Sequence, residues 1–308
     1  MRRWGRRSAA LIVAAASLAG GVTSRAGASP TSATTAAVGP CGQRAVGHYT
    51  RVAWIVLENV GTSLLDNPSA PFLDHLTREC GVAVNDHGVA HPSLPNYLAL
   101  VSGSAAGVAD DADPAYHHLD TPSIFSQLGS RWTSLVESMP TPCDRVSSGS
   151  YAAKHNPAVY FTSLGPACTH QDVPLTWPLT LSRAFTLIVP NVCHDMHDCS
   201  IAIGDAWVRR AVDAIVASAP YRAGQLVLFI TVDENDADAA NRVPTYVVAP
   251  SVPRGTVVTS AYTHYSLLAT TEALLGLHRL GAARRAATLL SPFHLGGLAR
   301  DERPSPHR

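Results

Sequence analysis

Short apolar runs recur along the chain, and stretches with apolar residues at helical spacing lie between them. Most of these runs are apolar at consecutive positions, which is typical of strands buried on both faces of a sheet. The predicted strands span residues 52–57, 81–84, 133–136, 185–189, 226–232 and 245–248. The predicted helices span residues 70–80, 93–101, 203–217 and 266–277. This alternation predicts an α/β fold with a mostly parallel central sheet and helices on both faces.

The N-terminal segment, residues 1–28, has the pattern of a secretory signal peptide. A basic start, MRRWGRR, precedes an apolar, alanine-rich run over residues 9–18 and then small residues up to Ala28. The apolar run is shorter than the ~20 residues that a membrane-spanning helix needs. We therefore expect cleavage after Ala28 and a secreted, extracellular protein without stable insertion in the membrane.

The rest of the chain divides into three parts by composition. Residues 29–44 are rich in Ser, Thr and Ala, bury little apolar surface and are predicted to form a flexible leader. Residues 45–300 are long enough for one large domain, which we expect to contain the functional site and to act as a monomer. The polar segment 301–308 is predicted to be a disordered tail.

Charge and cysteine content narrow the possible functions. The formal net charge is +0, and the mature chain has no basic cluster before Arg284 and Arg285, so we expect no nucleic-acid partner. The sequence has 6 cysteines, all beyond the predicted cleavage position, and an even number in an exported protein predicts disulfides. The sequence leaves their connectivity open, although Cys193 and Cys199 are close enough to staple the short loop between them.

Acidic residues directly follow two of the predicted strands. Glu58 and Asn59 end the run WIVLEN, while Asp233, Glu234 and Asp236 end the run FITVDEND. In a parallel sheet, ligands bind beyond the carboxyl ends of the strands. Neighbouring carboxylates repel each other unless a cation or protons intervene. A single strand followed by acidic residues is typical of a solvated loop, but two such strands at the same edge of the sheet favour a metal site.

The segment HPSLPNY places Ser93 and Asn96 immediately before an apolar helical run. Ser93 is therefore expected at or near a helix N-terminus, where free backbone N–H groups and the helix dipole attract an anion such as phosphate. A serine at this position also commonly serves only as a helix cap. The sequence alone leaves both interpretations, nucleophile and cap, open.

A third cluster lies in the segment PNVCHDMHDCS, after the strand predicted to end at residue 189. It brings imidazole and carboxylate groups into one loop: His194, Asp195, His197 and Asp198. A polar surface loop held by cysteines would explain the charges but not the two histidines. The density of ligand-type residues therefore favours a functional loop.

Two further segments offer basic groups, namely YAAKHNP with Lys154 and His155, and THYS with His264. Either histidine alone would be typical of a surface or capping residue. The chain has no GxSxG elbow before a helix, no HExxH segment and no P-loop. Ester hydrolysis by a simple Ser-His-Asp triad is therefore disfavoured.

Six motifs occur in this order: IVLEN, HPSLPNYLALVSG, YAAKHNP, CHDMHDCSIAIGDAW, TVDEND and THYSLL. In these motifs the chain resembles the bacterial phosphoesterase family of acid phosphatases and phospholipases C, most closely its secreted mycobacterial-type acid phosphatases. The resemblance spans roughly residues 52–277. It implies the alkaline-phosphatase-like fold, with a central sheet, helices on both faces and a metal site at one edge.

The resemblance also implies a role for each candidate residue. Ser93 matches the residue that attacks phosphorus. The implied metal ligands are Glu58, Asn59, Asp195, Asp198, Asp233 and Glu234. The implied phosphate contacts are Asn96, Lys154 and His155. His197 and His264 match positions around the metal and the leaving group, where either residue would protonate the departing alkoxide.

Together these observations predict a secreted phosphatase that hydrolyses phosphate monoesters through a phosphoserine intermediate, assisted by a divalent cation. The oxygen ligands favour Mg, Ca or Mn over Zn, and one bound ion is as compatible with the sequence as two. The expected substrate is a small phosphate ester, with a phosphoinositide or another phospholipid head group as further options. Two alternatives are a phospholipase C-type phosphodiesterase and a non-catalytic secreted binding protein on the same scaffold.

Overall fold

The computed structural model describes residues 39–43, 48–235 and 240–296. The predicted signal peptide (1–28), the tail (301–308), Asp236 and most of the predicted leader (29–44) lie outside the described residues. Among the helices of the described part, none combines the length and the apolar character needed to cross a bilayer.

Eight strands of the described chain form one sheet in the order β4-β3-β5-β1-β6-β7-β2-β8. The strands are β1 (Arg51–Leu57), β2 (Gly81–His87), β3 (Trp132–Val136), β4 (Asp172–Pro174), β5 (Phe185–Val189), β6 (Leu226–Val232), β7 (Arg242–Val248) and β8 (Thr256–Val258). Strand β7 is antiparallel to its neighbours β6 and β2, and every other pair is parallel. The predicted mostly parallel sheet is confirmed.

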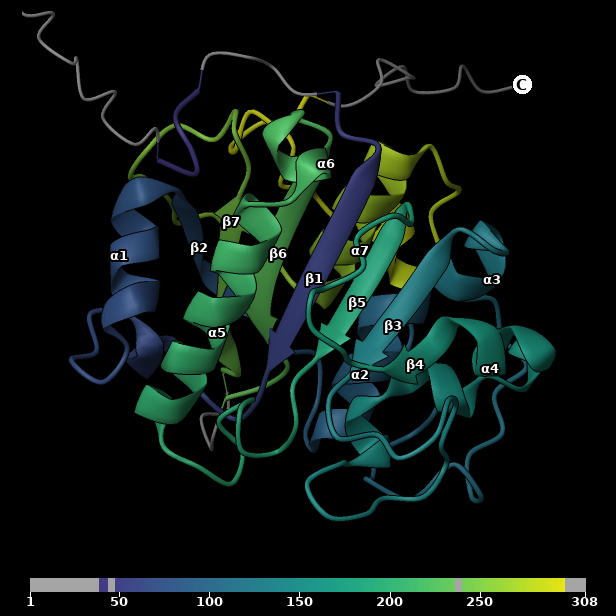
Figure 1. The fold of residues 1–308 in the computed structure, drawn as a ribbon. Coiled ribbons are helices and arrows are strands. Elements are labelled where there is room, and N and C mark those ends of the chain that lie inside the picture. The colour runs from purple at the N-terminus through teal and green to yellow at the C-terminus, as the bar shows by residue number, and fades with distance from the viewer. Residues whose placement is uncertain (1–38, 44–47, 236–239, 297–308) are drawn as a thin grey trace, which may run out of the picture. The chain divides into compact units, whose positions relative to one another are not determined.

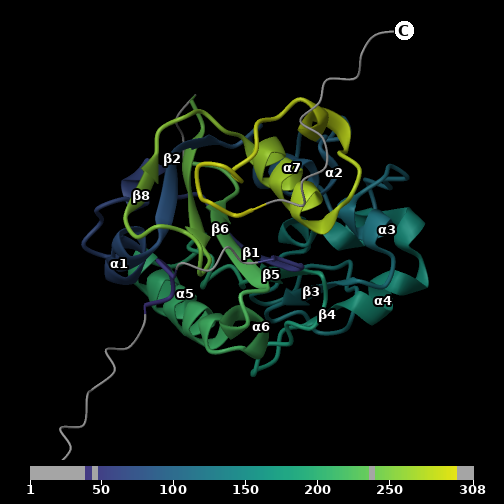
Figure 2. The ribbon, with the colours of Figure 1, turned by 90° about the horizontal axis from the view of Figure 1, so that it is seen from above.

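Helices cover both faces of the sheet, as Figures 1 and 2 show. One face carries α1 (Pro71–Glu79), α5 (Ile201–Val216) and α6 (Ala219–Arg222). The other carries α2 (Ser93–Ser102) and α7 (His264–Leu275). The short helices α3 (Ile124–Leu128) and α4 (Pro166–Gln171) lie at the end of the sheet formed by β3 and β4. This layered arrangement is the predicted α/β architecture.

The central strands are buried along nearly their whole length, because helices cover both faces. Every residue of β5 and β6 is buried, and β1 is buried from Val52 to Leu57. The Trp54 ring packs edge-on against Phe185, with 4.8 Å between the ring centroids. Its indole N–H donates a 3.1 Å hydrogen bond to Thr271 of α7. The consecutive apolar residues in the sequence thus correspond to strands without a solvent face.

The elements that the sequence analysis missed are short. Strands β4 and β8 have 3 residues each, too few to establish an alternating pattern. Helices α3, α4 and α6 have 5, 6 and 4 residues, which is less than two helical turns. Strand β2 also continues to His87 instead of ending at residue 84. Its polar end is accommodated because buried Asp86 accepts a 2.5 Å hydrogen bond from the Thr245 hydroxyl of β7.

Three disulfides connect all six cysteines: Cys41–Cys80, Cys143–Cys168 and Cys193–Cys199. The predicted local bridge across the histidine-rich loop is confirmed. This loop also packs closely on α5, because a Cβ added at Gly204 would lie 2.4 Å from the Met196 side chain. The bridge and the packing together fix the loop at one end of the sheet.

Candidate active site

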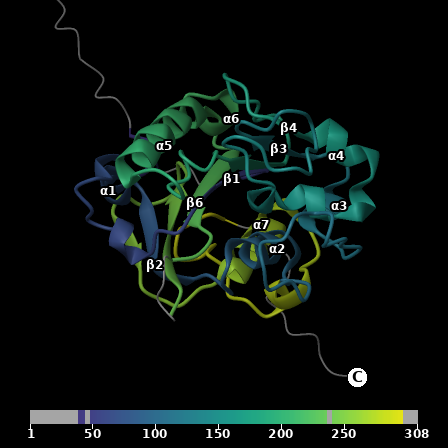
Figure 3. The same cartoon turned by 90° about the horizontal axis from the view of Figure 1, so that it is seen from below.

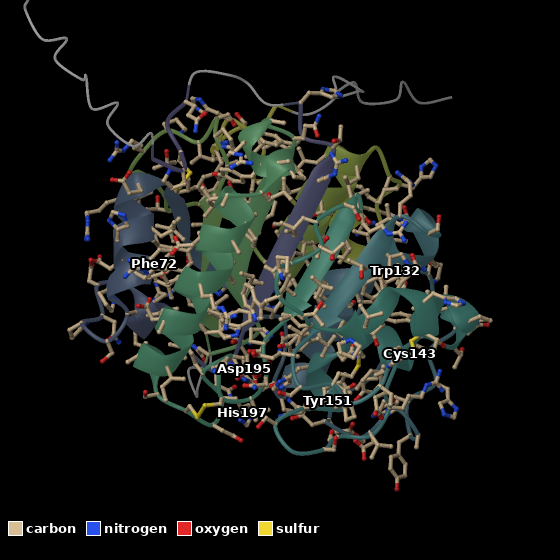
Figure 4. The ribbon with its side chains drawn as sticks, in the orientation of Figure 1. Phe72, Trp132, Cys143, Tyr151, Asp195 and His197 are labelled. Atoms are coloured by element: carbon tan, nitrogen blue, oxygen red, sulfur yellow. A yellow bond between two sulfur atoms is a disulfide. The ribbon has the colours of Figure 1, made fainter. Side chains whose placement is uncertain are left out.

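The predicted site residues converge at the carboxyl ends of the central strands. Glu58 directly follows β1, and Asp233 and Glu234 directly follow β6. The loop after β5 contributes Asp195 and His197, which Figure 4 places beyond the lower ends of the strands. Figure 3 shows this edge from below, with α2 and α7 on one side and α5 on the other. Segments far apart in the sequence therefore meet at one edge of the sheet.

Ser93 is the first residue of α2, and its hydroxyl faces two carboxylates. Its Oγ donates a hydrogen bond to Glu58 Oε2 at 2.9 Å and lies 3.3 Å from Glu234 Oε1, also in hydrogen-bond geometry. The helix is N-capped by Pro92, which offers no side-chain cap. Ser93 therefore lies one position inside the helix, and its side chain contacts the acidic cluster rather than capping the helix.

The turn before Ser93 is held in place by Asn96. Its Oδ1 accepts hydrogen bonds from the backbone N–H groups of Val89 (2.8 Å) and Ala90 (3.1 Å). Its Nδ2 donates to the carbonyl oxygens of Ala90 (2.8 Å) and Pro92 (3.2 Å). The buried side chain thereby uses two donor bonds and two acceptor bonds on the backbone. Asn96 thus positions Ser93, and its direct contact with phosphate stays a prediction.

The carboxylates of the site are buried and close enough to repel one another. Burial raises the pKa of Glu58 well above its usual value, and the charges of Asp233 and Asp195 raise it further. Burial and then the neighbouring Glu234 raise the pKa of Asp233 in the same way. The pKa of Asp195 rises to about 7, again chiefly through burial. A group of buried acids like this is costly to ionise unless a cation compensates the charge.

His155 lies inside this acidic cluster. Its Nε2 is 3.2 Å from Glu58 Oε1 and its Nδ1 is 3.1 Å from Asp195 Oδ2, and neither contact has hydrogen-bond geometry. Burial lowers the pKa of His155 well below its usual value, with further contributions from Lys154 and His197. The imidazole is therefore neutral near pH 7. The structure thus places this residue, predicted as a phosphate contact, among side chains that could hold a metal ion.

His197 and its neighbours form the more open side of the site. The backbone N–H of His197 donates to Asp195 Oδ1 at 2.8 Å, and its Nδ1 lies 2.7 Å from Asp198 Oδ1. Its Nε2 lies 3.4 Å from the Lys154 ammonium nitrogen. The side chains of His197 and Asp198 are 27% and 59% exposed. Asp198, predicted as a metal ligand, thus lies near the surface and orients His197.

Asn59 and His264 fix the position of Asp233. The backbone N–H of Asn59 donates to Asp233 Oδ1 at 3.3 Å, and Asn59 adopts a φ of 53°, which asparagine tolerates better than most residues. His264, the first residue of α7, is fully buried, and its Nε2 lies 2.5 Å from the Asp233 carbonyl oxygen. Burial lowers the pKa of His264 to about 4, although the hydrogen bond opposes this shift. A neutral His264 that donates this bond is poorly suited to protonate a leaving group near neutral pH.

Two residues of the site escaped the sequence analysis. His91 Nδ1 lies 2.6 Å from Glu234 Oε2, and Asp111 accepts a 2.8 Å hydrogen bond from the Lys154 ammonium. His91 stands in the motif that contains Ser93, so its place in the sequence offered a signal. Asp111 stands in the segment ADDADP, whose acids are typical of a solvated loop. Only the contact with Lys154 in the folded chain identifies Asp111 as a residue of the site.

The donor atoms of the cluster fit a divalent cation. Several buried side-chain atoms have no hydrogen bond: Glu58 Oε1, Asp195 Oδ2, Asp233 Oδ2, His155 Nε2 and His264 Nδ1. Buried polar atoms without partners are costly, and a bound cation would satisfy atoms of this kind. Ligand atoms of Glu58, His155 and His197 also lie within 4.8 Å of one another. The donor set thus contains imidazole nitrogens as well as the carboxylate oxygens expected from the sequence.

The sequence from residue 54 to residue 278 matches the Phosphoesterase family. The chain belongs to this family. It is therefore a hydrolase of phosphoric esters. The resemblance and the enzyme class predicted from the motifs are both confirmed.

Similar proteins of known name agree with this assignment. Phosphatidylinositol-3-phosphatase of Mycobacterium tuberculosis is 32% identical over 247 residues, which cover 77% of this chain and 81% of that protein. Phosphate-repressible acid phosphatase of Penicillium chrysogenum is 28% identical over 251 residues, covering 71% of this chain. The match spans only 57% of that fungal protein.

The fold of this phosphoesterase resembles the folds of solved proteins of the alkaline phosphatase superfamily. A solved protein of the alkaline phosphatase superfamily from Vibrio parahaemolyticus superposes with a TM-score of 0.54 at 9% identity, covering 80% of this chain and 71% of that one. At this identity the likeness concerns the fold alone. It confirms the alkaline-phosphatase-like α/β architecture predicted above.

Behind the site, a buried acid supports the segment that carries His155. Asn156 donates a 2.8 Å hydrogen bond from Nδ2 to Asp172 Oδ2 at the start of β4. Burial raises the pKa of Asp172 from 3.8 to about 7. The folded state therefore binds this proton more tightly than the unfolded state. The stability linked to it is fully present below about pH 4 and is lost as the pH rises through about 7.

We expect Asp172→Asn to flatten the pH dependence of stability. Between pH 5 and pH 8 the wild type should lose about 2–3 kcal/mol more unfolding free energy than the variant, because only the wild type must ionise this buried group. Urea denaturation at several pH values measures the difference. Asp213→Asn, at an exposed acid of α5, is the control and should follow the wild-type curve. Parallel curves for Asp172→Asn and the wild type would show that Asp172 ionises freely in the folded state.

Proposed function

We propose that this phosphoesterase is a phosphatase that cleaves phosphate monoesters with Ser93 as nucleophile, assisted by a divalent cation. The observation that supports this proposal is the environment of the Ser93 hydroxyl. It donates to Glu58 at the start of a helix, beside buried carboxylates that repel one another and polar atoms without partners. A hydroxyl held at a site suited to a cation and an anion matches the needs of phosphoryl transfer.

The first step transfers the phosphoryl group to the protein. Glu58 or Glu234, which both face the hydroxyl, accepts the Ser93 proton while Oγ bonds to phosphorus and the ester oxygen departs. Either carboxylate, when ionised, lies within hydrogen-bond distance of the hydroxyl and is placed to take its proton. A bound cation supplies charge neutralisation for the carboxylates and the phosphoryl oxygens, and lowers the hydroxyl pKa.

We assign proton donation to the leaving group to His197 rather than His264. His197 is partly exposed and is oriented by Asp198, whereas His264 is fully buried and its Nε2 lies against the Asp233 carbonyl. The Lys154 ammonium lies 3.4 Å from His197 Nε2 and is placed to contact a phosphoryl oxygen. His197, once neutral, then accepts a proton from the water that attacks the phosphoserine, while the carboxylate returns its proton to Ser93 Oγ and phosphate is released.

The substrate class follows from the relatives and from the openness of the His197 side of the site. The mycobacterial relative is named for a phosphoinositide and the fungal relatives for acid phosphatase activity. We propose small phosphate monoesters as substrates, including phosphoinositide head groups. Carboxylate ligands favour Mg, Ca or Mn, while the His155 nitrogen would also accept Zn. The signal-peptide pattern and the three disulfides support secretion.

Purified protein should hydrolyse p-nitrophenyl phosphate roughly 10²-fold faster than bis(p-nitrophenyl) phosphate, because a monoester offers the cation and Lys154 more negative charge. Phosphatidylinositol 3-phosphate should release phosphate, whereas phosphatidylcholine should remain intact. Chelation should remove the activity, and single additions of Mg, Ca, Mn or Zn should identify the ion that restores it. Faster cleavage of the diester or of phosphatidylcholine would instead identify a phospholipase C-type enzyme, and absence of turnover with every ion would indicate a binding protein.

A further inference from the structure

Asp111 joins two elements that the proposed reaction uses. It lies between α2 and α3, in a segment whose acidic residues gave no functional signal in the sequence. Its Oδ1 accepts a 2.9 Å hydrogen bond from the backbone N–H of Leu94, the residue after the nucleophile. Its Oδ2 accepts a 2.8 Å hydrogen bond from the Lys154 ammonium. A single carboxylate therefore ties the lysine to the first turn of α2.

The first of these contacts completes the start of α2. Helices leave their first N–H groups without intrahelical partners, and a side chain from the preceding residue normally fills this need. Pro92, which precedes this helix, makes no side-chain cap. Asp111, which lies 17 residues after Leu94 in the sequence, accepts the hydrogen bond instead. Its negative charge also suits the positive end of the helix dipole.

The second contact fixes a flexible cation. The Lys154 side chain has several rotatable bonds, and holding it in one conformation costs entropy unless a partner offsets that cost. The side chains of Lys154 and Asp111 are only 23% and 28% exposed, so solvent screens this pair less than a typical surface ion pair. The Lys154 ammonium therefore has a fixed position, 3.4 Å from His197 Nε2.

We propose that Asp111 is a positioning residue for phosphate-ester hydrolysis, which holds Lys154 against the N-terminal turn of α2 so that its ammonium contacts the phosphoryl group on Ser93. This inference rests on the proposed role of Ser93. Asp111 acts through Lys154 and does not touch the substrate itself. Without the Asp111 carboxylate, the Lys154 side chain can adopt other conformations in solvent. A displacement of about 1 Å at a reacting centre is enough to slow a reaction markedly.

A double-mutant cycle on the full chain, saturated with its activating cation, tests this inference. With p-nitrophenyl phosphate, Asp111→Ala should lower kcat by roughly 10- to 100-fold, and Lys154→Ala should lower it by at least as much. The double variant should be no slower than Lys154→Ala alone, because Asp111 has no effect without its lysine. Asp110→Ala is the matched control, since this adjacent acid pairs with His117 at the surface and should leave kcat unchanged.

Asp111→Asn separates positioning from helix capping. Its Oδ1 still accepts from Leu94, so the melting temperature should remain near that of wild type, while the loss of the ion pair should still lower kcat. Full activity of Asp111→Asn, or multiplicative losses in the double variant, would overturn the inference. Tighter binding of inorganic phosphate by Asp111→Asn would also overturn it, since Asp111 would then compete with the substrate for these groups.

The same cycle can be measured by phosphate binding, without turnover. Calorimetric titration with inorganic phosphate should show weaker binding in Asp111→Ala, and no further weakening when Lys154→Ala is already present. An equal loss in both backgrounds would contradict the inference. Failure of the proposed function would appear separately, as turnover retained by Ser93→Ala, and it would leave this binding cycle readable.

Discussion

Ser93→Ala should lower phosphate-ester turnover by roughly 10³-fold or more, while the melting temperature changes by less than about 4 °C. Turnover is lost because the variant has no oxygen to bond to phosphorus, and direct attack by water starts from a poorer position. Stability changes little because the variant loses one hydroxyl and its hydrogen bond to Glu58, a change of about 1 kcal/mol. Steady-state kinetics and thermal denaturation at saturating cation measure both effects.

Ser102→Ala is the matched control for this substitution. Ser102 is another buried serine of α2, and its Oγ donates to the backbone carbonyl of Leu98, away from the acidic cluster. Both variants lose one buried hydroxyl from the same helix, so only a catalytic role of Ser93 separates their activities. Retained turnover in Ser93→Ala would exclude the proposed nucleophile, and an equal loss in both variants would point to damage of α2.

The fold and the location of the site could be predicted because they depend on local patterns. Strands such as β1 and β6 are almost entirely apolar, and both are followed directly by acids. Parallel strands place their carboxyl ends at one edge, so Glu58 and Asp233 had to meet once both runs were identified as neighbouring strands. The edge strand β4 could not be predicted from the sequence, because three residues are too few to show a periodic pattern.

The roles within the site were harder to predict, because they depend on which atoms tertiary contacts have already occupied. Asn96 has a phosphate-binding residue type, yet its amide makes four hydrogen bonds to the preceding turn. His155 follows a lysine in a short 3-10 helix, and only the folded chain shows that its ring enters the acidic cluster while Lys154 points to Asp111. Residue type and spacing leave these orientations undetermined.

Glu58→Gln should have opposite effects on function and on the stability of the metal-free protein. The glutamate is fully buried, its Oε1 has no hydrogen bond, and burial with the charges of Asp233 and Asp195 raises its pKa well above the usual value. Its stabilising contribution in the metal-free protein is therefore greatest at low pH and is lost as the pH rises and the group ionises. A neutral glutamine of the same shape avoids that ionisation, so at pH 8 the metal-free variant should melt about 2–5 °C higher than the wild type.

With the cation present, Glu58→Gln should instead be impaired relative to the wild type. Loss of one carboxylate charge should weaken cation binding by roughly 10²-fold or more, and turnover should fall by roughly 10³-fold. Elemental analysis after dialysis, calorimetric titration with the activating ion and a phosphatase assay measure these losses. Glu272→Gln is the control, because Glu272 is a buried acid of α7 with a raised pKa of about 7, and it should gain stability at pH 8 without losing metal or activity. Unchanged cation affinity in Glu58→Gln would show that the ion binds elsewhere than in the acidic cluster beside Ser93.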